Sequence, residues 1–122
     1  SRIDFLLQTT DGHLPDCYLE VKNVTLDMGD GLAMFPDSVT TRGTKHLREL
    51  IEMANLGYRA VLLFCVQLSN ADRVEVATDI DPIYAKTMAL ALSKGVEVIA
   101  WRTKINTHGI SLHEPISYLG DC

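Results

Sequence analysis

The chain has 122 residues, of which 47% are hydrophobic and 22% charged, and its formal net charge is −5. This composition indicates a single soluble α/β domain and excludes a disordered protein. The excess of acids excludes strong DNA binding by the whole surface, so any nucleic-acid contact would need a local basic patch. The longest apolar run, residues 60–66, is too short to span a membrane.

The three cysteines lack the C-x-x-C spacing of a zinc site and do not form a disulfide framework. We therefore expect a protein of the reducing cytoplasm, with no membrane association. The first residue is Ser1 rather than methionine, and we expect a fragment of a longer protein.

The N-terminal part predicts a β-hairpin. Residues 3–8 and 17–26 read as strands, and residues 9–16 contain turn chemistry, with Asp11-Gly12 as the sharpest signal. A loop is predicted over residues 27–31. Residues 31–36 form a short extended piece, because Pro36 disfavours helix before it.

The remaining residues alternate helix and strand. Apolar residues at helical spacing predict a helix over residues 44–56, with Thr44 or alternatively Thr41 as N-cap and Gly57 just beyond its end. The continuous apolar run 60–67 predicts a strand buried on both faces, at the centre of a mixed sheet. Residues 69–78 are predicted to be irregular.

A second helix is predicted to start at Asp81-Pro82, with the aspartate as N-cap, and to end at Gly95. Residues 96–101 predict a strand, and a turn over 106–109 leads into a small strand over 110–113. This order predicts an α/β fold with a mixed central sheet flanked by helices.

Charged residues interrupt two predicted strands. Asp4 lies within an aliphatic run, and Glu20 and Lys22 lie two residues apart, so both point to the same face of their strand. Carboxylates of Asp4 and Glu20, with the backbone carbonyl of Val21, would supply hard oxygen ligands to Mg²⁺ or Mn²⁺. Lys22 would then supply the cation that positions an attacking water and neutralises the phosphate charge. This pattern favours a metal-dependent phosphodiester site with Asp4, Glu20 and Lys22 as catalytic residues. The alternative is a salt bridge of Lys22 with either acid on an exposed sheet surface.

A second cluster, of basic residues, surrounds the start of the first predicted helix. Arg42, Lys45, His46 and Arg48 lie where helices ordinarily carry acids, and backbone N–H groups at a helix start favour anions. One interpretation is a phosphate clamp that binds DNA. The other is a solvated helix face whose cations pair with acids further along the helix.

These segments resemble the sugar fermentation stimulation protein family (SfsA). The resemblance covers essentially the whole chain, with matches in residues 1–7, 18–26, 59–64, 79–85 and 95–98. It is most specific in the block Phe35-Pro36-Asp37, Arg42-Gly43 and Lys45-His46-Leu47-Arg48-Glu49-Leu50.

The resemblance implies that residues 1–122 are the C-terminal domain of a longer protein, with a restriction-endonuclease-like PD-(D/E)XK core. The N-terminal OB-like domain of the family is absent from this chain. On that pattern Asp4 matches the first acid, and Glu20 and Lys22 match the (D/E)-x-K element. The resemblance implies non-specific DNA binding and regulation of sugar (maltose) metabolism. An active Mg²⁺-dependent nuclease and a degenerate domain for protein interaction are the alternatives.

Overall fold

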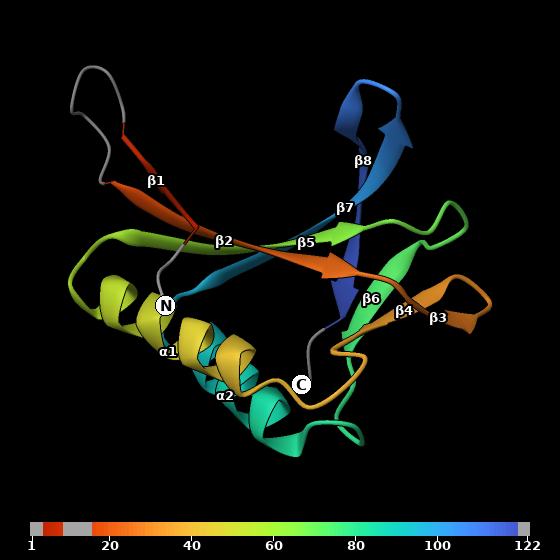
Figure 1. Ribbon diagram of the computed structural model, residues 1–122. Helices are drawn as coiled ribbons and strands as arrows, with labels where there is room; N and C mark the ends of the chain where they lie inside the picture. The colour runs from red at the N-terminus through yellow and green to blue at the C-terminus, as the bar shows by residue number, and fades with distance from the viewer. Residues whose placement is uncertain (1–3, 9–15, 120–122) are drawn as a thin grey trace.

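The computed structural model describes residues 4–8 and 16–119. Eight strands and two helices occupy these residues (Figure 1). In chain order they are β1 (Phe5–Leu7), β2 (Cys17–Val24), β3 (Leu26–Gly29), β4 (Leu32–Phe35), α1 (Thr41–Asn55), β5 (Arg59–Val66), β6 (Arg73–Val76), α2 (Pro82–Ser93), β7 (Glu97–Asn106) and β8 (Gly109–Leu119).

The strands form one mixed sheet in the order β1-β2-β5-β7-β8-β6-β4-β3. β2, β5 and β7 run parallel to one another, whereas β1 pairs antiparallel with β2, and β8 antiparallel with β7. α1 and α2 precede β5 and β7, as crossover connections between parallel strands require. The predicted mixed α/β architecture is confirmed.

The strand β5 lies between β2 and β7, and seven of its eight residues are buried. A strand covered on both faces needs apolar side chains pointing in both directions, which explains the unbroken apolar run. The prediction of a central buried strand is therefore confirmed, one residue earlier in the chain than expected.

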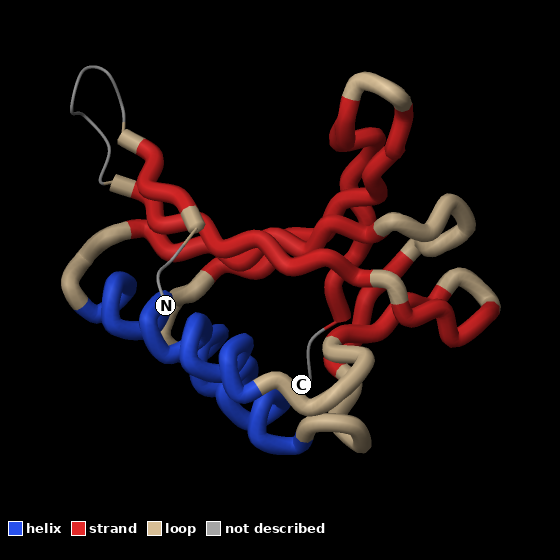
Figure 2. The backbone as a smooth tube through the Cα atoms, in the orientation of Figure 1, coloured by secondary structure: helices blue, strands red, loops and turns tan. Residues whose placement is uncertain are grey.

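Both helices lie side by side on the same face of the sheet (Figures 1 and 2). Leu47, Leu50 and Ile51 form the buried stripe of α1, and they join Leu62 and Phe64 of β5 in the hydrophobic core. This packing fixes the position of α1 over the strands β2 and β5.

The N-cap of α1 is Thr40, so the predictions of Thr44 and Thr41 are wrong. The Thr40 hydroxyl accepts a hydrogen bond from the Gly43 backbone N–H at 2.9 Å. A side chain at Gly43 would collide with Thr40 and approach the Tyr84 ring to 3.2 Å, which explains the glycine in this turn. The helix therefore begins three residues before the predicted start at residue 44.

The predicted start of α2 is confirmed, because Asp81 is its N-cap and Pro82 its first residue. Both predicted helix ends are confirmed as well: Gly57 and Gly95 follow the C-caps of α1 and α2, each at φ 93°.

Two segments predicted as loop or irregular contain strands. Residues 27–31 belong largely to the hairpin of β3 and β4, and residues 69–78 include β6. In β6 the charged Arg73 and Glu75 alternate with Val74 and Val76, the pattern of a strand with one buried face.

The C-terminal strands are longer than predicted, because β7 and β8 form an extended antiparallel hairpin rather than two short strands. The predicted turn at residues 9–16 falls almost wholly on residues 9–15, outside the described residues. Neither α1 nor α2, the helices of the described residues, is long and apolar enough to cross a membrane.

Candidate functional site

Glu20 and Lys22 project from β2 on the same face, as the sequence predicts. The Lys22 ammonium nitrogen lies 3.5 Å from Glu20 Oε1. Glu20 is only 1% exposed, although glutamate almost never occupies a fully buried position without a partner. The pair is therefore an interior arrangement beneath α1 rather than a salt bridge on an exposed sheet surface.

Asp4 joins this group through two hydrogen bonds between the segment before β1 and β2. The Asp4 backbone N–H donates to Glu20 Oε2 at 3.2 Å. The Val21 backbone N–H donates to Asp4 Oδ2 at 2.9 Å. These bonds hold the exposed Asp4 carboxylate beside the buried Glu20. A role of the Val21 carbonyl as a metal ligand stays a prediction.

His46 enters the same site from α1. Its Nδ1 lies 3.0 Å from Glu20 Oε1 and 2.9 Å from the Lys22 nitrogen, and the residue is only 2% exposed. The sequence predicts His46 as a DNA contact, whereas the structure places its ring inside the protein. Its position was foreseeable, because residue 46 lies one turn before the buried Leu50 and so on the core side of the helix.

Burial dominates the electrostatics of this site. It raises the pKa of Glu20, an effect that Lys22 opposes and Asp4 reinforces. Burial also lowers the pKa of His46, and the nearby Lys22 ammonium lowers it further. Both groups are therefore shifted toward their neutral forms, which leaves Lys22 as the cation that pairs with Glu20 among the described residues.

The basic residues of α1 differ in their burial. Arg42, Lys45 and Arg48 are all exposed, whereas His46 is buried. The positive charge of Arg42 lowers the pKa of His46, so Arg42 interacts electrostatically with the site.

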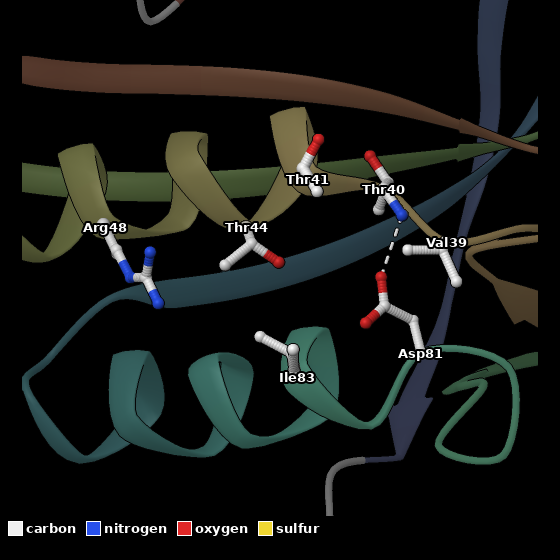
Figure 3. A pocket seen from close by; sticks show the side chains of 7 residues that line it. All are labelled: Val39, Thr40, Thr41, Thr44, Arg48, Asp81 and Ile83. Carbon is white, nitrogen blue, oxygen red and sulfur yellow. Dashed lines mark hydrogen bonds between the residues drawn. The ribbon is translucent and has the colours of Figure 1, made fainter.

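Arg48 instead lines a pocket of about 240 Å³ between α1 and α2. In this pocket the Asp81 carboxylate accepts a hydrogen bond from the Thr40 backbone N–H at 2.8 Å (Figure 3). Arg48 at this pocket is thus separated from His46, which contacts Glu20 and Lys22, and the phosphate clamp stays a prediction.

Tyr84 of α2 lies fully buried beneath the site. Its ring packs edge-on against Phe35 at 5.3 Å between centroids. Burial raises the pKa of its hydroxyl, and the negative charges of Glu20 and Asp81 add to that effect. Tyr84 therefore belongs to the packed core of the domain.

The carboxylates of Asp4 and Glu20 and the ammonium of Lys22 come together beside the strand β2. Within the described residues, no three His, Cys, Asp or Glu side chains are grouped as a ready-made metal cage. Mg²⁺ is commonly held by one or two carboxylates, with waters and substrate phosphates completing its shell. Asp4 and Glu20 meet that smaller requirement.

One mixed sheet with two helices on one face, which carries Glu20 and Lys22 on β2 and Asp4 just before β1, defines an α/β domain. Residues 1–109 match the family model described as the sugar fermentation stimulation protein RE domain, and the chain belongs to this family.

The curated relatives carry the same family description. The sugar fermentation stimulation protein homolog of Ruegeria sp. (strain TM1040) is 56% identical over 112 residues, which are 92% of this chain and 47% of the relative. The homolog of Pseudoalteromonas atlantica is 53% identical over 114 residues, 93% of this chain and 47% of the relative. The chain thus spans about half the length of the curated relatives it matches.

A solved structure has the same fold. The structure of Pyrococcus furiosus SfsA in complex with Ca²⁺ superposes with a TM-score of 0.85 at 30% identity, and the match covers 98% of this chain and 50% of that one.

Proposed function

We propose that the chain is a DNA-binding domain with a nuclease-type divalent-cation site formed by Asp4 and Glu20. The observation that carries the proposal is the buried Glu20 carboxylate, 1% exposed and shared between Lys22 and the Asp4 backbone. An isolated buried acid destabilises a fold, and such groups concentrate where function requires them.

The donor set supports a hard cation. Both proposed ligands are carboxylates, and the hydrogen bonds between Asp4 and the strand β2 hold them side by side before any cation arrives. The Ca²⁺ in the related Pyrococcus furiosus structure is consistent with such chemistry. The cation we infer for this chain is Mg²⁺ or Mn²⁺, which would neutralise charge on a phosphodiester.

The protein's own groups supply the remaining chemistry. Lys22 provides an ammonium at the edge of the site, where it would hold a phosphate oxygen or orient a water. Arg42 and Lys45, exposed on the first turns of α1, would contact backbone phosphates. Phosphate contacts carry no base information, so we propose binding without sequence preference. A cellular role in regulating sugar (maltose) metabolism and a cytoplasmic location belong to this proposal.

An active nuclease is the second candidate. The observation that favours it is Lys22, whose nitrogen lies 3.5 Å from the Glu20 carboxylate. An ammonium beside a buried acid pairs with it in either case, and in hydrolysis it would also stabilise the charge that develops in the transition state.

The test is a cleavage and binding assay with the full-length protein that contains this chain. Single- and double-stranded DNA would be incubated with Mg²⁺, Mn²⁺ or a chelator, and binding would be followed by fluorescence anisotropy with Ca²⁺. A nuclease cleaves with Mg²⁺ or Mn²⁺ and loses at least about 10²-fold in rate in Glu20→Gln and Lys22→Met, as for loss of a transition-state contact. A DNA-binding domain without turnover binds in every condition and cleaves in none.

Two surface variants serve as matched controls. Glu97→Gln removes an exposed acid on β7 that pairs with Arg59, and Lys94→Met removes an exposed lysine at the end of α2. Both should behave like the unchanged protein. Absence of DNA binding and of divalent-cation binding in calorimetry would refute the proposal.

A further inference from the structure

Among the described residues, the Lys22 ammonium has two acceptors beside it, and His46 provides the nearer one. The Lys22 nitrogen is 2.9 Å from His46 Nδ1 and 3.5 Å from Glu20 Oε1. An ammonium carries three N–H donors and no lone pair, so a nitrogen at 2.9 Å from it has to accept. His46 Nδ1 is then unprotonated, and the proton of the neutral ring is on Nε2.

The contact of His46 with Glu20 fits this assignment. Glu20 Oε1 and His46 Nδ1 are 3.0 Å apart, and the same ammonium forms an ion pair with Glu20 and donates to His46. The opposite tautomer, with Nδ1–H donating to Glu20, would aim that proton beside three others on Lys22. Two acceptors bridged by one cation are the electrostatically consistent arrangement.

The ring is held in place by burial rather than by its second nitrogen. His46 Nε2 is buried and has no hydrogen-bond partner among the described residues. An apolar side chain would fill the same space without burying an unpaired polar atom. The presence of a histidine at this buried position is therefore explained by the contact of its Nδ1 with Lys22.

We propose that His46 is a positioning residue that holds Lys22 through Nδ1. The proposal rests on the proposed cation site at Glu20. A carboxylate that shares its charge with a bound cation attracts the Lys22 ammonium less strongly. His46, neutral and fixed on α1, is the acceptor that keeps the ammonium at the site in that state.

The first test is the tautomer of His46 in the unmodified, cation-free protein. Long-range ¹H–¹⁵N correlation spectra of the full-length protein distinguish a bare Nδ1 from a protonated one. We expect the proton on Nε2. A proton on Nδ1 would mean that His46 donates to Glu20 and would overturn the proposal.

The second test compares two amide variants. An asparagine amide reaches the position of Nδ1, whereas a glutamine amide extends to the position of Nε2. Acetylation of Lys22 by acetic anhydride, quantified by peptide mass spectrometry, should be about fivefold faster in His46→Gln than in the unchanged protein, the factor for one lost hydrogen bond. His46→Asn should stay close to the unchanged protein. The exposed Lys86 of α2 and Lys94 at its C-cap are internal references.

These results separate the proposal from the function on which it rests. Calorimetric titration of Mg²⁺ or Mn²⁺ into the unchanged protein and Glu20→Gln tests the cation site alone. Absence of cation binding would remove the proposed function, while the tautomer and the Lys22 labelling still report whether His46 holds Lys22. Equal Lys22 labelling in His46→Asn and His46→Gln would overturn the positioning role even if the cation binds.

Discussion

Asp81 joins the starts of the two helices, and Asp81→Ala should be among the most destabilising polar substitutions in the chain. One carboxylate oxygen accepts from the Tyr84 backbone N–H at 3.0 Å and caps α2. The other accepts from the Thr40 backbone N–H at 2.8 Å and so fixes the cap residue of α1. The carboxylate is 3% exposed, and water cannot readily replace it.

The size of the effect follows from these two bonds. Loss of an N-cap costs about 1 kcal/mol, and a buried donor left without a partner costs about 1–3 kcal/mol. Asp81→Ala should therefore lower the free energy of unfolding by about 2–4 kcal/mol. Asp81→Asn keeps one oxygen and should cost about half as much. Thr40→Ala removes only the cap on Gly43 and should cost about 1 kcal/mol.

Urea unfolding followed by circular dichroism measures all three variants. Asp79→Asn, an exposed aspartate two residues away, is the control and should lie within about 0.5 kcal/mol of the unchanged protein. A loss below about 0.5 kcal/mol in Asp81→Ala, or an equal loss in Thr40→Ala, would refute the double role of the carboxylate.

Three further outcomes are expected. Burial raises the pKa of the Glu20 carboxyl above its ordinary value of 4.5, so the folded protein keeps this proton to a higher pH than the unfolded chain does. The cation-free protein should therefore lose stability as the pH rises from 4.5 through the raised pKa. Urea unfolding between pH 4 and 8 should show a flatter dependence of stability on pH in Glu20→Gln, and identical profiles would contradict the burial argument. Leu50→Ala, at a fully buried position of α1, should cost about 2–5 kcal/mol in thermal unfolding, whereas Leu56→Ala, 69% exposed, should change little. Arg42→Ala with Lys45→Ala should weaken DNA binding of the full-length protein equally for all sequences and reduce the salt slope by about 2, measured by anisotropy at several salt concentrations; an unchanged slope would assign both residues to a solvated helix face.

The relation of Glu20 to Lys22 was predictable from the sequence, because strand alternation places residues two apart on one face whatever the fold around them. The depth of Glu20 was not, since it depends on α1 crossing over β2. The contact of His46 with Glu20 and Lys22 could not be predicted either, because it too depends on how α1 packs on the sheet. It requires the rotation of α1 about its axis, which is set by the packing of Leu47 and Leu50 against the sheet.

The errors in the fold also have physical causes. The strand β6 is only four residues long and polar residues precede it, so its alternation is too short to stand out from a loop. The N-cap of α1 was misplaced because threonines occupy positions 40, 41 and 44 around the start of the helix, and the choice of Thr40 depends on Asp81, which lies 41 residues away in the sequence.

The position of Asp4 in the site depends on the edge strand β1 staying paired with β2. It has three residues, its side chains Phe5, Leu6 and Leu7 are each about half exposed, and among the described strands it pairs with β2 alone. Short strands with few buried contacts open at far lower free energy than a core.

Asp4 immediately precedes this strand, whereas Glu20 and Lys22 lie on β2, which β5 supports from its other side. Fraying of β1 would therefore withdraw one carboxylate and leave the helices, the central strands and the other site residues in place. Any chain or ligand that covers β1 would govern how often the two acids meet, without touching either of them.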